Sequence, residues 1–169
     1  FNKPGVFDEI KKVLKTLDIK FTTLASIASS KGTAGFKELI TYFNKPGVFD
    51  EIKKVLKTLD IKFTTLASIA SSKGTAGFKE LITYFNKPGV FDEIKKVLKT
   101  LDTRFTALST MVQSKGGAGL EELITYFNKP GVFAEIKKVL ETLDIPFTSL
   151  AGIASQKGAA VFKELITYL

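Results

Sequence analysis

The chain has 169 residues, of which 44% are hydrophobic and 25% charged, a composition that is typical of a folded protein and excludes a disordered tract. It contains no cysteine and no histidine, which excludes disulfides, zinc sites built on these residues and histidine-based acid–base catalysis. Its formal net charge of +8 is typical of a nucleic-acid-binding surface, although many proteins carry as much charge for solubility alone.

The sequence repeats itself with a period of 42 residues, in copies that span 1–42, 43–84, 85–126 and 127–168. The first two copies are identical. A copy of this length is too short to bury its own apolar face, so we expect a single repeat array over 1–169 with one shared core. No stretch reaches the roughly 18 consecutive apolar residues of a transmembrane helix, and we expect neither a signal peptide nor a membrane partner.

The first predicted helix of a copy spans about residues 4–17 and opens at a Pro-Gly corner. Acidic residues in its first turn and lysines further along suit the helix dipole. Its apolar residues recur at helical spacing: Val6, Phe7, Ile10, Val13, Leu14 and Leu17.

A second predicted helix spans about 23–30, with Thr22 as its N-cap because a threonine stands there in every copy. Gly32 is predicted to end this helix at its C′ position, before a third helix over about 33–43. The third helix has an apolar face of Phe36, Leu39, Ile40 and Phe43. Three helices per copy and no strand pattern predict an all-α fold, an α-solenoid. Armadillo-type repeats have a similar period and helix number, but their asparagine ladder is missing here.

A Lys-Gly pair recurs where the second and third predicted helices meet. The first amides of a helix have no acceptor within it, so beside a lysine they suit an anion such as phosphate. A row of such sites matches the regular phosphates of a nucleic acid, whereas lysine after a helix is also ordinary C-terminal chemistry. The candidate nucleic-acid-binding residues are Ser30, Lys31, Gly32, Ser72, Lys73, Gly74, Ser114, Lys115, Gly116, Gln156, Lys157 and Gly158.

The junction carries a recognisable local pattern. Residues 27–33 read Ile-Ala-Ser, Ser-Lys, Gly-Thr, and residues 111–117 read Met-Val-Gln, Ser-Lys, Gly-Gly. Over about 16 of each 42 residues, this pattern resembles the repeats of transcription-activator-like effectors (TALEs) and their bacterial relatives. The resemblance implies a right-handed superhelix around double-stranded DNA, in which the second residue of each pair reads a base and the next amides touch phosphate.

By this resemblance the base-reading pairs are 30–31, 72–73, 114–115 and 156–157. Each copy differs from that family by a whole additional helix, over about 4–17. The second residue of each pair is always lysine, for which guanine O6 and N7, or a phosphate, are the natural acceptors. We expect an intracellular protein, cytoplasmic or, for a bacterial effector, in the host nucleus.

Other interpretations stay open. A solenoid also offers a concave groove to a protein, and the recurring lysines of the first helix, such as Lys11, Lys12 and Lys15, favour an acidic protein or peptide. The chain is also compatible with a fragment of a longer or engineered array, whose uncapped apolar ends would associate end to end. We expect no enzyme, metal or cofactor, because no base is present to activate the serines and threonines.

Overall fold

The computed structural model describes the chain apart from residues 1–4, 29–30, 114, 156–157 and 169, and apart from the side chains of 158, 161, 162 and 165. Within the described residues it contains twelve α-helices and no strand. The prediction of an all-α fold is therefore confirmed. In this described part of the chain, no helix is long and apolar enough to cross a membrane.

Three helices fall in each copy of the repeated sequence. The first copy contains α1 (Val6–Leu17), α2 (Phe21–Ala28) and α3 (Gly32–Phe43). The second contains α4 (Val48–Leu59), α5 (Phe63–Ala70) and α6 (Thr75–Phe85). The third contains α7 (Val90–Thr100), α8 (Phe105–Met111) and α9 (Gly116–Phe127). The fourth contains α10 (Val132–Leu143), α11 (Phe147–Ile153) and α12 (Gly158–Tyr168).

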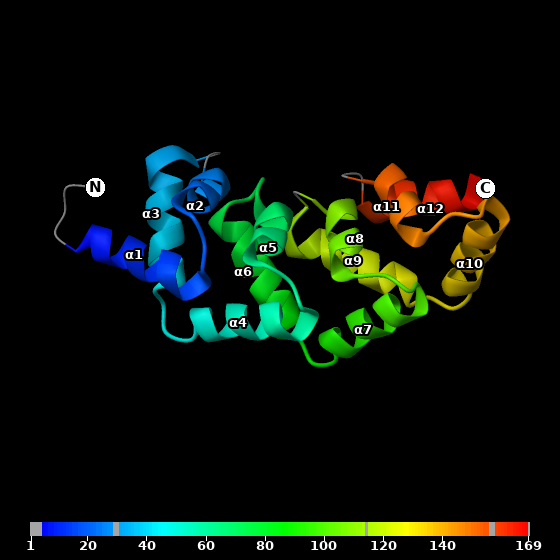
Figure 1. Ribbon diagram of the computed structural model, residues 1–169, viewed down its shortest axis with the longest axis horizontal. Helices are drawn as coiled ribbons and strands as arrows, with labels where there is room; N and C mark the ends of the chain where they lie inside the picture. The colour runs from blue at the N-terminus through cyan, green and yellow to red at the C-terminus, as the bar shows by residue number, and fades with distance from the viewer. Residues whose placement is uncertain (1–4, 29–30, 114, 156–157, 169) are drawn as a thin grey trace.

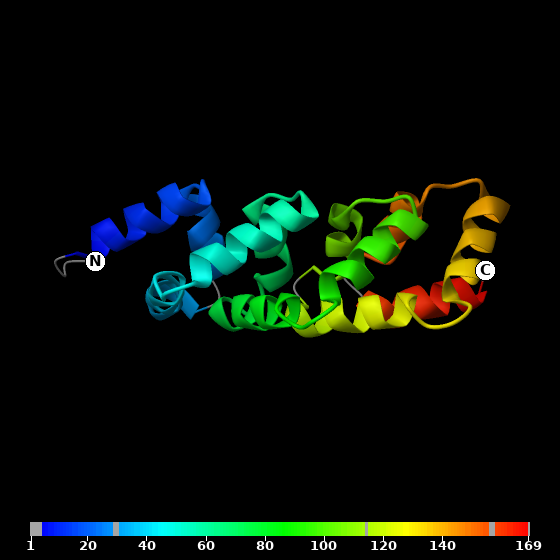
Figure 2. The ribbon, with the colours of Figure 1, turned by 90° about the horizontal axis from the view of Figure 1, so that it is seen from below.

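The helices follow one another along an elongated molecule, with the two ends of the chain at opposite extremities (Figure 1). The second helices of the copies, α2, α5, α8 and α11, pack against one another in succession. The third helices, α3, α6, α9 and α12, do the same and form a row in Figure 2, in which α6 and α9 make the most extensive contact. Each first helix packs against the third helix of its own copy.

Two residues with left-handed backbones bracket the first helix of a copy. In α4, Gly47 precedes the helix with a φ of 83° and Asp60 follows it with a φ of 50°. The N–H of Ile61 then donates to the carbonyl oxygen of Leu56 at 3.0 Å, as in a Schellman motif. The equivalent aspartates Asp18, Asp102 and Asp144 also have positive φ. The same stop signal therefore operates in every copy.

The predicted N-cap role of Thr22 is wrong. Helix α2 begins at Phe21, two residues before the predicted start at residue 23, and in the second copy the extended N-cap residue is Lys62, with a ψ of 156° and no side-chain cap hydrogen bond. In the second copy the phenylalanine is held in the first turn because its ring belongs to the core, where Phe63 stacks on Phe78 with 5.3 Å between ring centroids; in the first copy Phe21 contacts Phe36 at the same centroid distance. Core packing overrides the local capping preference of threonine.

The junction glycine also has a different place from the one predicted. Helix α5 ends at Ala70, residues 71–73 follow, and Gly74 is the N-cap of α6. The glycine therefore opens the third helix and does not close the second as its C′ residue. Its φ of 56°, which Gly32 shares, still requires a residue without a Cβ, because this left-handed region strains other side chains.

The core runs across the boundaries between copies. Phe43, at the end of α3, meets the rings of Phe63 and Phe78 edge-on, with centroid distances of 5.8 and 5.3 Å. The neighbouring Tyr42 is also buried, as are Tyr84 and Tyr126 in the next two copies. A copy without its neighbour would expose these rings, so adjacent copies stabilise each other through the hydrophobic effect.

Candidate nucleic-acid interface

The Lys-Gly junctions that precede α3, α6 and α9 lie along one long edge of the molecule, the upper edge in Figure 1. Among the described lysines there, Lys31 and Lys115 are exposed and Lys73 is partly exposed. The flanking residues Gly74 and Gly116 are buried, whereas Gly32 and Ser72 are exposed, and Gly158 begins α12. The other predicted site residues, Ser30, Ser114, Gln156 and Lys157, lie outside the described residues.

Two of the junction lysines are paired with a glutamate of the helix that follows. The Nζ of Lys31 lies 3.8 Å from a carboxylate oxygen of Glu38. The Nζ of Lys73 lies 2.9 and 3.1 Å from the two carboxylate oxygens of Glu80. Ion pairs with this much solvent contact contribute about 0–1 kcal/mol each, so a phosphate can displace the glutamate at small cost.

The closeness of the second pair follows from a substitution in the third copy. Glu38 is shared, because Lys79 of the next copy lies 3.4 Å from its carboxylate. At the following boundary the residue equivalent to Lys79 is Glu121, so Glu80 has no such lysine to contact and pairs closely with Lys73. Glu121 instead pairs with Lys87 at 2.5 Å.

The junction of the third copy differs from the first two. Within the described part of the chain, no carboxylate lies at ion-pair distance from Lys115; Glu122, the equivalent of Glu38, pairs with Lys163 of the fourth copy at 3.5 Å. Lys115 therefore carries an uncompensated charge. It is the described junction lysine best placed to receive a phosphate.

A protein carboxylate already lies at the start of α9. A Cβ added to Gly116, the first residue of this helix, would come within 2.6 Å of an oxygen of Glu80 and 3.4 Å of the Nζ of Lys73. The positive end of a helix dipole favours such a negative neighbour. A carboxylate therefore already lies beside the first residue of this helix, and a phosphate bound there would compete with Glu80.

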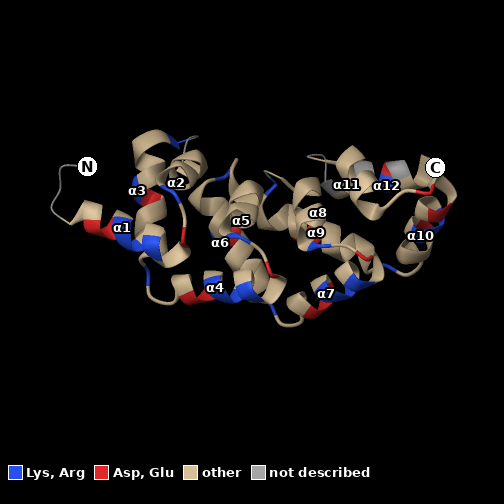
Figure 3. Cartoon of the chain, viewed as in Figure 1, with Lys and Arg blue, Asp and Glu red and all other residues tan. Residues whose placement is uncertain are grey.

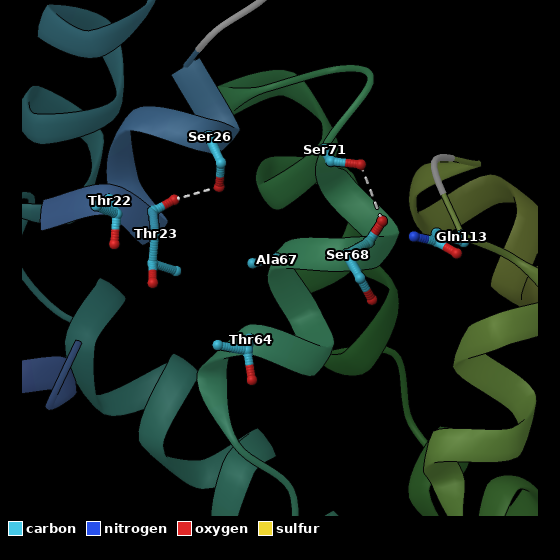
Figure 4. Close-up of a pocket in the computed structure, with 8 residues that line it drawn as sticks. All are labelled: Thr22, Thr23, Ser26, Thr64, Ala67, Ser68, Ser71 and Gln113. Atoms are coloured by element: carbon cyan, nitrogen blue, oxygen red, sulfur yellow. Dashed lines mark hydrogen bonds between the residues drawn. The ribbon is translucent and has the colours of Figure 1, made fainter. Parts of the chain in front are cut away.

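A polar trough, which the sequence analysis did not predict, runs along the second helices. Its first hollow has a volume of about 410 Å³ and lies between α2 and α5 (Figure 4). The hydroxyl side chains that line this hollow are Thr22, Thr23, Ser26, Thr64, Ser68 and Ser71. A second hollow of about 600 Å³ lies between α8 and α11 and includes Thr106, Thr110 and Thr148. Gln113 lines both, and we call the two hollows together the hydroxyl trough.

The serine hydroxyls in the trough are oriented by the helices beneath them. The Oγ of Ser26 donates to the carbonyl oxygen of Thr23 at 2.8 Å, and Ser68 donates to Thr65 at the same distance. A hydroxyl that donates its hydrogen bond to a backbone carbonyl can only accept one from a ligand, through the lone pairs of its oxygen. The serines therefore suit a ligand that donates hydrogen bonds, such as a base edge, and phosphate contacts fall to the cations nearby.

Much of the variation between copies falls in this trough. The residues equivalent to Ser26 in the other copies are Ser68, Thr110 and Gly152. Ser26 and Ser68 line the first hollow, and Thr110 and Gly152 line the second. The position of Ser71 is Gln113 in the third copy. The signal was present in the sequence as hydroxyl residues at helical spacing, but only the packing of one second helix against the next makes a trough of them.

Cations stand at both ends of the uncharged helices that form the floor of the trough, and at the starts of these helices they alternate with exposed aspartates such as Asp18 and Asp60. Helices α2, α5, α8 and α11 contain no charged residue (Figure 3). At their starts stand the exposed residues Lys20, Lys62 and Arg104, the last of which lines the second hollow beside Asp102. Past their ends stand the junction lysines. An eight-residue helix is roughly 12 Å long, so the two rows of cations are about one helix length apart.

Stacking of bases on the tyrosines has no support in the geometry. Tyr42, Tyr84 and Tyr126 are buried between copies. Burial, and after it the nearby Glu51 carboxylate, raise the pKa of the Tyr42 hydroxyl to about 12. These three rings are packing residues, and they offer no open face to a single-stranded ligand.

The chain was compared with protein-family models, with curated proteins and with solved structures. None of the three comparisons finds a match.

Proposed function

We propose that the chain is an α-solenoid of four repeats that binds nucleic acid, double-stranded DNA in preference, through the hydroxyl trough and its two rows of cations. The observation that carries this proposal is the position of the junction lysines, which lie along one edge beside a trough whose floor is uncharged. Lysine, arginine and hydroxyl side chains supply most contacts to phosphate in nucleic-acid complexes. The resemblance to TALE repeats points to the same ligand and the same loops.

In this proposal, different side chains of the trough contact the phosphates and the bases. Lysines at the junctions contact phosphates and add affinity without reading sequence. The serine oxygens, together with the side chain of Gln113, face the position where a base edge would lie. Where a junction lysine reaches a base, guanine O6 and N7 are its acceptors, so the array would prefer G-rich sites.

The test is a binding series with labelled duplex DNA, single-stranded DNA and RNA at several salt concentrations. Replacing Lys31, Lys73, Lys115 and Lys157 together with alanine removes the junction charges. We expect the slope of log affinity against log salt to become shallower by about 3 to 4, because each phosphate contact contributes about 0.9 to that slope. Helicity and melting should not change, since surface pairs contribute little to stability.

The matched control removes four lysines from the row of first helices. Lys11, Lys53, Lys95 and Lys137 are exposed and occupy the same position in each copy. Their replacement with alanine changes the net charge by the same amount and should leave the slope nearly unchanged. Equal losses in the two variants would show attraction to net charge alone and would reject the proposed interface.

An acidic protein partner is the second candidate. Lysines of the first helices have exposed positions for it, but each such helix also carries acidic residues in its first turn, so the row has mixed sign (Figure 3). Lys12, Lys54 and Lys96 are further engaged over the rings of Phe49, Phe91 and Phe133. A partner of this kind would be lost with the control variant and kept with the junction variant.

A further inference from the structure

The third copy brings to the hydroxyl trough two side chains that the other copies lack there. Gln113 stands where the other copies have a serine, such as Ser71. Arg104 stands where the first two copies have Lys20 and Lys62. An amide and a guanidinium can each make two hydrogen bonds in a fixed geometry, whereas a hydroxyl or an ammonium group imposes no such geometry. The side chains best suited to distinguish one ligand group from another are therefore found in this copy.

Gln113 lies where the two hollows of the trough meet. On one side it lines the first hollow, across from Ser68 and Ser71 of α5 (Figure 4). On the other side it lines the second hollow, together with Arg104 and Thr110. Its side chain is exposed, and within the described residues its amide makes no hydrogen bond. The amide can therefore both donate to a ligand and accept from it.

The hydroxyls beside Gln113 limit what that ligand can be. Ser68, Ser71 and Thr110 each donate a hydrogen bond to the backbone carbonyl oxygen three residues earlier, at 2.8, 3.0 and 2.7 Å. Each of these three hydroxyls can then only accept a hydrogen bond from a ligand. The surroundings of Gln113 thus favour a ligand group that carries an amino group.

Among the four bases, adenine matches this arrangement best. In the major groove adenine presents the N7 acceptor next to the N6 amino donor, which a glutamine amide can contact at the same time. Guanine presents two acceptors there, N7 and O6, cytosine presents only its N4 amino donor, and thymine presents the O4 acceptor and a methyl group. Each of the other three bases therefore leaves one half of the amide of Gln113 without a partner.

Two cations of the third copy are placed to hold the sugar-phosphate backbone near Gln113. Arg104 precedes α8 and Lys115 follows it, and both are exposed. In the described part of the chain neither has a carboxylate at ion-pair distance, although Asp102 lines the same hollow as Arg104. Phosphate contacts of this kind fix the register of a nucleic acid on a protein, and contacts to base edges then read its sequence.

We propose that Gln113 reads an adenine, accepting a hydrogen bond from its N6 amino group and donating one to its N7, while Arg104 and Lys115 hold phosphates on either side. This inference rests on the proposed function, because it names the base that the trough selects when it binds double-stranded DNA. It also differs from base reading by the junction lysines, which would select guanine. The trough should therefore prefer A·T to G·C base pairs, and the preference should depend on one side chain.

The test compares three labelled duplexes: alternating A·T, the same duplex with 7-deazaadenine in place of adenine, and alternating G·C. The 7-deaza base has a carbon in place of N7 and keeps the N6 amino group. We expect the unaltered chain to bind A·T about 5-fold or more tightly than G·C, because a bidentate contact discriminates against the wrong base by at least this factor. The 7-deaza duplex should bind about 2- to 10-fold more weakly than A·T, since one hydrogen bond is lost.

Two variants assign these preferences to Gln113. Gln113→Met keeps the length of the side chain without its hydrogen bonds, and Gln113→Ser introduces the residue of the other copies. Because residue 113 is exposed, both variants should keep their helicity. Both should bind A·T and its 7-deaza form equally, with an unchanged salt slope, because Gln113 contacts no phosphate. The control Thr125→Met, at an exposed site of α9 that lines neither hollow, should keep both preferences.

The possible failures of this inference and of the proposed function can be told apart. If the unaltered chain binds DNA with the salt slope and the lysine dependence expected above but prefers G·C, or does not distinguish adenine from 7-deazaadenine, this inference alone is overturned. An effect of 7-deazaadenine that persists in Gln113→Met would assign the N7 contact to another residue and would also overturn it. Absence of binding to all three duplexes at low salt would reject the proposed function and this inference together.

Discussion

The Nζ of Lys73 lies 2.9 Å from a carboxylate oxygen of Glu80, and the pair lies against Gly116, the first residue of α9. The carboxylate thus lies beside the start of α9, where a bound anion would compete with it. Within the proposed function, Glu80 competes with the ligand at this junction, and Lys73 can contact a phosphate only after its ion pair with Glu80 is broken.

Replacing Glu80 with glutamine should therefore strengthen nucleic-acid binding. The substitution keeps the shape of the side chain but frees Lys73, and a surface pair of about 0.2–1 kcal/mol corresponds to an affinity gain of about 1.5- to 5-fold. The salt slope should steepen by up to about 1. Glu141→Gln, at an exposed position of α10, makes the same change in net charge and should have a smaller effect. Equal gains from both variants would contradict a specific role for the pair.

Thr103→Ile should stabilise the fold. Thr103 follows Asp102 at the end of α7, where the other copies have isoleucine, and its Oγ1 is buried without a hydrogen-bond partner in the described structure. Isoleucine removes this unsatisfied hydroxyl, which should raise the free energy of unfolding by about 1 kcal/mol. Urea unfolding measures the change. Thr83→Val, at an exposed site in α6, is the control and should stay within about 0.5 kcal/mol of the unaltered chain; a loss of stability with Thr103→Ile would contradict the inference.

Gly117→Ala should destabilise the contact between α6 and α9. An added Cβ would lie 2.6 Å from the backbone carbonyl atoms of Glu80 and 2.8 Å from the backbone N of Leu81, neither of which can move alone. We expect a loss of about 1–3 kcal/mol in the free energy of unfolding, as for overpacking elsewhere. In the first two copies the equivalent residue is a threonine, Thr33 or Thr75, so this limit comes from the close approach of these two helices and not from the helix itself.

The matched control for that substitution is Gly152→Ala. A Cβ at this position of α11 meets nothing within 4 Å, and alanine favours helix by up to about 1 kcal/mol over glycine. Gly152→Ala should leave stability unchanged or raise it. Similar losses from both substitutions would show that steric contact with α6 is not the cause.

Stability should fall as the pH rises from about 10 to 12. Burial raises the pKa of Tyr42 to about 12 and raises the pKa of Tyr84 and Tyr126 in the same direction, with nearby glutamates as the second cause. The folded chain therefore holds protons that the unfolded chain releases near pH 10, so the contribution is complete below pH 10 and is lost through the folded-state pKa. The ultraviolet absorbance of tyrosinate follows the titration, with the chain in denaturant as the control. Complete ionisation of the three buried tyrosines near pH 10 with the fold intact would contradict this.

The sequence by itself was sufficient to predict the helices. The apolar spacing of residues 6–17, the Pro-Gly corner before them and the aspartate after them are local features, and local backbone preference and helical periodicity are enough to interpret them. The twelve helices within the described residues and the absence of strands there follow from that periodicity. The junction glycine was also correctly given a special backbone, although its role as a closing residue was wrong.

Tertiary structure decided the rest, because the remaining features depend on which surfaces meet. Thr22 lost its predicted cap role because the ring of Phe21 is held in the first turn by contacts made in space. The ion-pair partner of a junction lysine depends on one residue of the next copy, which is a lysine at position 79 and a glutamate at position 121. Lys79 reaches Glu38, which lies 41 residues away in the sequence. The hydroxyl trough exists only where one copy packs against another. Periodicity specifies the faces of a helix, but only packing determines what each face meets.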